Sequence, residues 1–343
     1  MKKINKITFL LLLTIFASGY VFAGGGSRNG TAGATELLIP VGARGIAMSS
    51  ATLTNATGVE ALYWNPANVA RGSENTNVLF SHMNYIADIN VEYGAISTNI
   101  EGFGALALSI KSLNIGDIPV TTVTNPDGTG QTFSPQYTTV GFTYSRLLSD
   151  RIAVGVTTNL VMETLGLVST TGVAFNIGLS YANLGNVEGL NIAFVLKNIG
   201  PQMKYDGSGL YYSAISDELD RPTQLYKVQA ASFELPSTLE IGLGYNYNIN
   251  ESNKLILNGV FQNSNFYADE YKVGAEYGYN NTFFVRAGYD YLSEVSADYN
   301  IYGLTAGAGV QYNMGGLNVK FDYAYRDVDF FDANHVFTVT LGF

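Results

Sequence analysis

Large apolar residues recur at every second position along most of the chain, from about residue 77 to its last residue. In one such stretch, Leu317, Val319 and Phe321 alternate with Asn318 and Lys320. A period of two residues puts successive side chains on opposite faces of a β-strand. We count about fourteen such segments, each near the ~10 residues that cross a bilayer at a tilt. The predicted strands begin near Asn77, Ile89, Phe103, Tyr137, Ile152, Val173, Asn191, Ser237, Leu255, Glu270, Phe283, Asn300, Leu317 and His335.

The apolar faces of these strands contact either a soluble core or lipid, and composition helps to separate the two. Charged residues make up 13% of the chain, which is about half of the share usual in soluble proteins. Tyr and Phe recur near the ends of the apolar faces, as they do on the lipid face of an outer-membrane barrel. We therefore predict an all-β fold, a transmembrane antiparallel β-barrel of about 14 strands over residues 77–343, with a soluble sandwich as the alternative.

The connections between the predicted strands give an independent test of this fold. If the chain enters from the periplasm, the joints after even-numbered strands should be tight turns. Those joints are short and rich in Asn, Gly or Asp, as turns should be. Two joints after odd-numbered strands are long, at residues 116–136 and 203–236. Long joints therefore fall only where the outer surface is expected.

Both ends of the sequence carry features of export and membrane insertion. A basic start at residues 2–6, an apolar run at 7–16 and a small-residue cleavage site ending at Ala23 predict a signal peptide at residues 1–23. We therefore expect an exported, integral protein of the bacterial outer membrane, in contact with outer-membrane lipid. The last predicted strand resembles the C-terminal signal that the outer-membrane insertion machinery recognises, through Phe337, Val339, Leu341 and Phe343.

Residues 24–76 lack the two-residue alternation and precede the predicted barrel. They begin with a Gly-rich tether and continue with an apolar stretch at residues 37–41 that is too apolar to remain in solvent. Pro66 disfavours a helical conformation at Asn65 and turns the chain. We predict that this segment folds into the barrel lumen as a hatch, or plug.

The hatch segment resembles the N-terminal signature of the PorV/PorQ family, which belongs to the FadL-like (OmpP1) superfamily of outer-membrane barrels. The resemblance lies in the stretches PVGARGIAMSSA and GVEALYWNPANVA. Ser49-Ser50 stands where many family members have a pair of glycines. The matching residues are Pro40, Gly42, Arg44, Gly45, Ala47, Met48, Glu60, Ala61, Tyr63, Trp64, Asn65, Pro66 and Ala67.

The resemblance implies two functions, and both remain open at this stage. PorV-like proteins act in the type IX secretion system, where they receive exported cargo through its C-terminal domain and pass it to the attachment machinery. FadL-like relatives take up fatty acids and other hydrophobic compounds. A general porin is a third hypothesis, although the apolar N-terminal stretch argues against an open pore.

The sequence carries little sign of catalytic chemistry. Its net charge of −10 argues against a nucleic-acid partner. Its histidines, His82 and His335, lie near predicted strand ends without a nucleophile pattern, and there is no cysteine. We therefore expect no enzyme, cofactor or metal. The charges at inward positions within the last five predicted strands suggest a lumenal ion-pair network or a seat for the hatch, with a narrow ion path as the alternative: Lys272, Glu276, Arg286, Asp290, Lys320, Asp322 and Arg326.

Overall fold

The computed structural model describes Arg28 and residues 30–215, 222–293 and 300–343 of the chain. The predicted signal peptide, residues 1–23, lies outside the described residues. No helix in the described part of the chain is long and apolar enough to cross a membrane.

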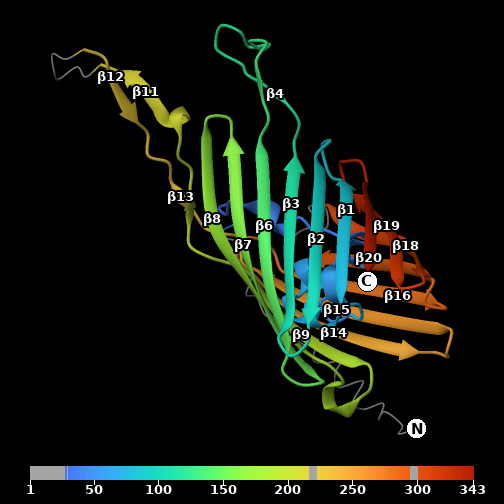
Figure 1. Cartoon of the computed structure of the whole chain (residues 1–343). Coiled ribbons are helices and arrows are strands. Elements are labelled where there is room, and N and C mark those ends of the chain that lie inside the picture. Colours follow the sequence, from blue (N-terminus) through green and yellow to red (C-terminus); the bar gives the residue numbers. More distant parts are fainter. Residues whose placement is uncertain (1–27, 29, 216–221, 294–299) are drawn as a thin grey trace.

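Fourteen antiparallel strands form a closed barrel, as predicted (Figure 1). Each strand pairs with its neighbours in chain order, and β1 closes the ring against β20 with Asn77 opposite Gly342 and Asn84 opposite His335. The barrel strands are β1 (Thr76–Asn84), β2 (Asn90–Ile100), β3 (Gly104–Asn114), β6 (Gln136–Leu147), β7 (Ile152–Leu165), β8 (Val168–Tyr181), β9 (Leu190–Ile199), β14 (Thr238–Asn248), β15 (Asn253–Ser264), β16 (Glu270–Tyr279), β17 (Phe283–Leu292), β18 (Tyr302–Met314), β19 (Leu317–Val328) and β20 (Asn334–Gly342).

The predicted strand starts agree with the structure to within two residues, except for β8. That strand begins at Val168 rather than near Val173, because Val168 pairs with Leu165 across a tight turn and extends the hairpin. The added residues, VSTTG, lack large alternating side chains, so the apolar pattern could not locate them.

Alternating burial along the strands confirms which faces point outward. Leu108 on β3, Val285 on β17 and Phe321 on β19 are more than half exposed and point away from the lumen. On β20, Phe337 is exposed and its neighbour Val336 is fully buried. An outer wall of exposed apolar side chains is suited to lipid contact.

The two long joints project from the same rim of the barrel, as the loop lengths predicted (Figure 1). The joint between β3 and β6 contains the short pair β4 (Ile118–Pro119) and β5 (Thr132–Phe133). The joint between β9 and β14, residues 200–237, is called the outer loop below. It contains the pairs β10 (Met203–Lys204) with β13 (Ser232–Phe233) and β11 (Tyr211–Ala214) with β12 (Gln224–Lys227).

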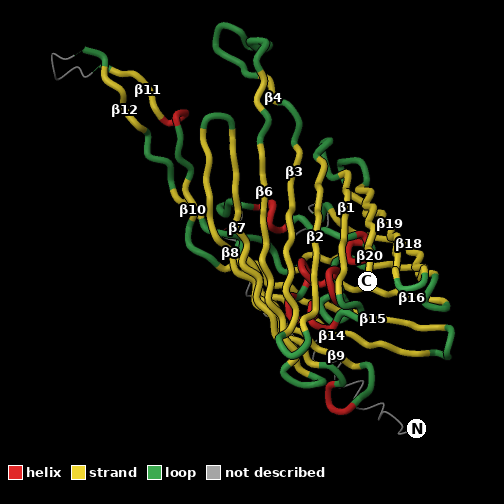
Figure 2. Tube along the Cα trace, viewed as in Figure 1, coloured by secondary structure: helices red, strands yellow, loops and turns green. Residues whose placement is uncertain are grey.

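The residues before β1 form a hatch of short helical turns enclosed by the strands (Figure 2). The hatch touches the wall on several sides: η4 contacts β6, β7 and β8, α2 contacts β18, β19 and β20, and η3 contacts β1 and β2. Its apolar residues and the inward residues of the wall form one buried core. The turns are η2 (Thr35–Leu38), α2 (Ala43–Ile46), η3 (Gly58–Glu60), α3 (Ala61–Trp64) and η4 (Pro66–Arg71).

Candidate functional site

The first half of the N-terminal motif shapes the middle of the hatch. Gly42 precedes α2 with a φ of 86°, which side-chain-bearing residues rarely adopt. Gly45 lies directly beneath the indole of Trp64, since a Cβ on Gly45 would be 2.4 Å from the ring. Pro40 lines a cavity on the outer side of the hatch. These glycines therefore allow α2 and the Trp64 ring to pack in close contact.

The second half of the motif packs against the barrel wall. Asn65 is extended and its side-chain oxygen accepts a hydrogen bond from the backbone N–H of Ala67 at 3.0 Å, so Pro66 begins η4. A Cβ on Gly155 of β7 would lie 2.3 Å from the carbonyl oxygen of Pro66. A Cβ on Gly178 of β8 would lie 2.2 Å from the Asn65 side chain. Glycine at both wall positions thus leaves the space that the hatch fills.

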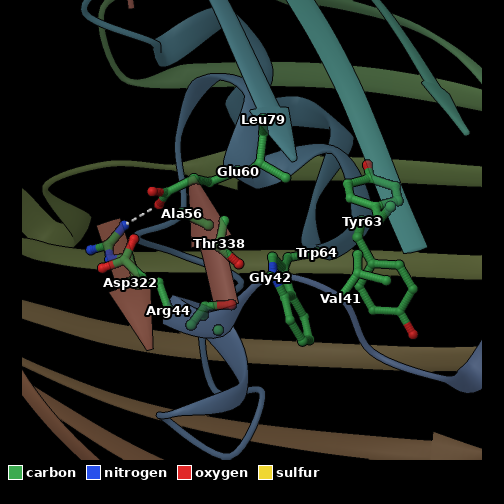
Figure 3. A pocket seen from close by; sticks show the side chains of 13 residues that line it. Val41, Gly42, Arg44, Ala56, Glu60, Tyr63, Trp64, Leu79, Asp322 and Thr338 are labelled. Atoms are coloured by element: carbon green, nitrogen blue, oxygen red, sulfur yellow. Dashed lines mark hydrogen bonds and ion pairs between the residues drawn. The ribbon is translucent and has the colours of Figure 1, made fainter. Parts of the chain in front are cut away.

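Six charged side chains join the hatch to the wall in an alternating ion network. Arg44 pairs with Glu60 at 2.9 Å and with Glu276 at 2.8 Å. Arg286 bridges Glu276 and Asp322, and Lys320 bridges Glu60 and Asp322. Figure 3 shows the side chains of Arg44, Glu60 and Asp322 close together. All three line a small cavity of about 20 Å³. The members of the ion network are Arg44, Glu60, Glu276, Arg286, Lys320 and Asp322.

The ion network is electrically balanced, with three cations and three anions. The side chain of Arg286 is fully buried and that of Asp322 is 1% exposed, so the pairs lie in a medium that screens charge poorly. Burial alone would raise the pKa of Glu60, but Lys320 and Arg44 outweigh it and lower that pKa to about 2. The carboxylate of Glu60 is therefore charged throughout the physiological range.

The remaining three predicted lumenal charges do not belong to this network. Lys272 pairs with Glu270 at 2.6 Å, and Arg326 donates two hydrogen bonds to the side-chain oxygen of Asn334 at 2.9 and 2.7 Å. Asp290 lines the same cavity as these two cations. The structure thus divides the seven predicted charges into two groups: Glu276, Arg286, Lys320 and Asp322 hold the hatch, and Lys272, Asp290 and Arg326 line the outer side of the lumen.

An open cavity of about 540 Å³ lies above the hatch at the outer end of the barrel, and is called the outer cavity below. Its lining combines apolar, aromatic and charged side chains, which include Leu38, Tyr63, Tyr85, Ile86, Leu113 and Tyr302. Lys197 pairs with Glu240 at 2.9 Å in the same lining, and its ammonium lies 5.0 Å from the Tyr63 ring centre. A mixed lining of this kind suits an amphipathic partner better than a purely apolar one.

Several charged residues of the lumen were missed by sequence reasoning. Lys111, Glu163, Lys197 and Glu240 all lie at inward positions of barrel strands and are buried. The rule used for the last strands, that a charged residue at an inward position of the alternation lies in the lumen, would also have predicted these four residues. Glu36 lies in the hatch, where no alternation exists to assign it a direction.

One hydroxyl group connects the hatch to the seam of the barrel. Thr338 on β20 accepts a hydrogen bond from the backbone N–H of Ala43 at 2.8 Å. The same hydroxyl donates to the Ser81 hydroxyl on β1 at 2.9 Å. A similar contact lies on β18, where Thr305 donates to the carbonyl of Ala47 at 3.0 Å. The hatch is therefore hydrogen-bonded to β18 and to β20, one of the two strands that meet at the seam.

The outer loop presents an aromatic surface to solvent. On β11 and β12, Tyr211, Tyr212 and Tyr226 are 45%, 52% and 37% exposed. The rings of Tyr212 and Tyr226 stack across the pair with centres 6.2 Å apart. Leu225 beside them is 66% exposed. Figure 1 shows this pair of strands extending beyond the barrel rim. The loop therefore offers an exposed aromatic surface beyond the barrel rim.

The structure gives no metal centre in the part of the chain that it describes, where no three His, Cys, Asp or Glu side chains cluster. His82 lies on β1 and pairs with Glu92 at 2.6 Å. His335 lies on β20, and its ring accepts or donates a hydrogen bond with the Tyr323 hydroxyl at 2.8 Å. Neither histidine lines any of the cavities described above.

Comparison with known proteins identifies one family and one fold. The family model described as "Type IX secretion system protein PorV" matches residues 25–264, from before the hatch to the end of β15. No curated protein matches the chain.

Three solved structures are similar in fold. A deltaS2S3 mutant of the TodX monoaromatic hydrocarbon channel has a TM-score of 0.53 and 13% identity, over 88% of this chain and 97% of that one. The toluene transporter TodX of Pseudomonas putida has a TM-score of 0.50 and 13% identity, over 84% of this chain and 94% of that one. A FadL homologue of Pseudomonas aeruginosa has a TM-score of 0.49 and 12% identity, over 88% and 98%.

Proposed function

Because the chain belongs to the family of the type IX secretion system protein PorV, we propose that it is a non-enzymatic component of protein secretion to the cell surface. In this role the outer mouth of the barrel binds the C-terminal domain of an exported cargo protein, or another protein of the secretion system. The barrel itself lies in the bacterial outer membrane, with its apolar wall in contact with lipid.

The observation that carries the proposal is a lumen filled by the hatch beneath an open outer mouth. The ion network and the contacts at Gly155 and Gly178 fix the hatch on opposite sides of the lumen. A folded protein cannot pass through such a barrel. The surface left for a protein partner is therefore the outer rim, with its loops and the outer cavity.

The chemistry of the outer loop supports a protein as the partner. Tyrosine supplies a large amphipathic contact surface and is enriched where proteins bind each other. The exposed rings of Tyr211, Tyr212 and Tyr226 lie on a paired strand segment outside the membrane. Such a surface can bury apolar area against another protein while its hydroxyl groups form hydrogen bonds.

A pull-down with the purified full chain tests this proposal. The probes are the solubilised outer-membrane proteins of the same bacterium and the C-terminal domain of one of its secreted proteins. We expect capture by the wild-type protein and at least tenfold weaker capture by the Tyr212→Ser, Tyr226→Ser variant, in line with the ~2 kcal/mol or more that a central aromatic contributes. Tyr247→Ser is the matched control, because Tyr247 is also exposed but lies outside the outer loop.

Failure to capture either probe, together with loss of fatty-acid uptake in a deletion strain, would reject the secretion role. Equal capture by the wild-type protein, the double variant and the control would show that the binding surface lies outside the outer loop.

A channel for hydrophobic compounds is the second candidate function. Two observations favour it: the outer cavity has apolar and aromatic lining, and the fold resembles the TodX channels. The test is uptake of labelled fatty acid and toluene by deletion and complemented strains. Single-channel conductance of porin size in planar bilayers would support a general porin.

A further inference from the structure

The N-terminal part of the hatch, residues 30–38, is called the strap below and connects the rest of the hatch to the outer loop. At one end Gly33 donates a backbone hydrogen bond to the carbonyl of Glu234 at 3.1 Å, and Arg28, just before the strap, pairs with the Glu234 carboxylate at 2.8 Å. Further along, Ala34 and Leu37 pack into a small apolar cluster with the wall and the outer loop. The strap therefore touches both the wall and the loop that carries the exposed tyrosines.

Two buried carboxyl groups meet where the strap crosses the wall. Glu36 in the strap is 5% exposed and Glu163 on β7 is 2% exposed. Their carboxyl groups interact directly, and the Oε1 atom of each has no hydrogen-bond donor in the protein. The other oxygen of Glu163 accepts a hydrogen bond from the hydroxyl of Tyr205 in the outer loop. Two carboxylates cannot donate to each other, so a proton between them is the donor that both oxygen atoms lack.

The charges around the pair are consistent with one bound proton. Lys111 on β3 faces the pair, and its ammonium donates to the backbone carbonyls of Glu36 at 2.7 Å and Ile39 at 3.2 Å. Tyr137 on β6 and Tyr205 contribute neutral hydroxyl groups. One ammonium and one proton balance two carboxylates, so the cluster is neutral in its buried setting.

We propose that Glu36 and Glu163 share a single proton, and that this carboxyl pair is a latch that holds the strap and the outer loop against the barrel wall. The latch joins three parts of the chain: the hatch through Glu36, the wall through Glu163 and the outer loop through Tyr205. Loss of the proton leaves two facing carboxylates, and their repulsion opens the latch.

The pH at which the latch opens follows from its surroundings. Burial, together with the negative charge of Glu163, raises the pKa of Glu36 from its usual value near 4.5 to about 7. A carboxyl whose pKa is raised in the folded state stabilises that state at low pH, and this contribution is lost as the pH rises through the raised pKa. The latch is therefore closed below about pH 6 and opens above about pH 7.

The sole tryptophan of the chain reports on the strap. Trp64 is 5% exposed, and its neighbour Tyr63 donates hydrogen bonds to the carbonyls of Leu37 and Leu38 at 3.2 and 3.0 Å. The Tyr63 ring packs edge-on against Trp64, with ring centres 4.9 Å apart, so release of the strap frees Tyr63 and opens Trp64 to solvent. Acrylamide quenching of its fluorescence, measured on the full chain in detergent micelles between about pH 5 and pH 9, follows the latch directly.

In the wild-type protein we expect quenching to be low at acid pH and to rise severalfold with a midpoint near pH 7. Glu36→Gln and Glu163→Gln should each abolish the rise, because a glutamine amide donates to the remaining carboxylate at every pH. Glu92→Gln is the matched control: Glu92 pairs with His82 on the outer wall, and its replacement should leave the rise unchanged. The heat-dependent gel migration of the barrel verifies that each variant is folded.

Tyr205→Phe removes the hydroxyl that links Glu163 to the outer loop and leaves the pair of carboxyl groups intact, so it tests that link alone. This variant should keep low quenching at pH 6 but show severalfold faster trypsin cleavage at the exposed Lys204 and Lys227. A flat wild-type quenching profile, or an unchanged rise in both glutamine variants, would overturn the proposal.

Discussion

The guanidinium group of Arg44 in the hatch forms a two-pronged ion pair with the carboxylate of Glu276 on β16, at 2.8 and 2.9 Å. The two residues lie 232 positions apart in the sequence. The same guanidinium also reaches Glu60 at 2.9 Å. Arg44 therefore provides the direct connection between the hatch backbone, the hatch carboxylate and the wall.

Replacing Arg44 by methionine should destabilise the protein by about 3–5 kcal/mol. The variant removes one cation and leaves two buried carboxylates short of a partner, which is the costly way to break a buried ion pair. Denaturant unfolding in micelles, followed by Trp64 fluorescence, measures the change. Arg146→Met is the control, since Arg146 is exposed on β6. Equal stability of both variants would show that Arg44 contributes little to seating the hatch.

Acid should weaken the ion network only well below neutral pH. The pKa of Glu60 is lowered to about 2, so its contribution is complete above its usual pKa of 4.5 and is lost as the pH falls toward 2. Glu60→Gln should therefore cost on the order of 3 kcal/mol at neutral pH, and the difference from wild type should shrink toward pH 2. Unfolding curves at several pH values test this, with the exposed Glu101→Gln as control. A cost that does not change with pH would contradict it.

Gly178→Val should displace η4 from the wall. The added side chain would overlap the Asn65 side chain, which lies 2.2 Å from the position of its Cβ. Overpacking of this kind costs typically about 1–3 kcal/mol, and we expect Trp64 to become more accessible to acrylamide. Gly259→Val is the control, because no atom lies within 4 Å of a Cβ at Gly259. Identical quenching in the two variants would argue against close packing at β8.

Leu108→Arg should impair insertion into the membrane. Leu108 lies near the middle of β3, is 53% exposed and points outward, and arginine near the bilayer midplane costs about 2–4 kcal/mol in such barrels. The yield of folded barrel in lipid vesicles, read from heat-dependent gel migration, gives the effect. Val123→Arg places the same charge in a fully exposed loop and should fold like wild type. A normal yield for Leu108→Arg would mean that this face does not contact hydrocarbon.

The strands could be predicted from the sequence because each residue faces either lipid or lumen, and its polarity must suit that side whatever its neighbours are. Whether Phe321 points outward depends only on its own position in a period of two, and the structure confirms that it does. On β7, Thr158 likewise alternates with the buried Thr157 and Asn159. The predicted start of β8 was wrong by five residues. The hairpin extends past the apolar part of the strand, and the residues there show no apolar alternation from which a strand could be predicted.

For the interior, the sequence predicted that ion pairs would form but not which residues would pair. Charges at inward positions indicated ion pairs, but pairing depends on strand register and on where the hatch residues fall. Arg44 and Glu60 were recognised as motif residues, yet no spacing connects them to Glu276 or Lys320. The carboxyl pair of Glu36 and Glu163 was missed for the same reason, since it depends on how a segment without periodicity crosses a strand.

The hydroxyl of Thr338 bears on how the molecule is assembled. It is hydrogen-bonded at once to Ala43 in the hatch and to Ser81 on the strand that closes the ring. Closure of the cylinder and seating of its plug therefore depend on the same hydroxyl group. A plug in place when the first and last strands meet thus adds its own hydrogen bond to the joint that completes the cylinder.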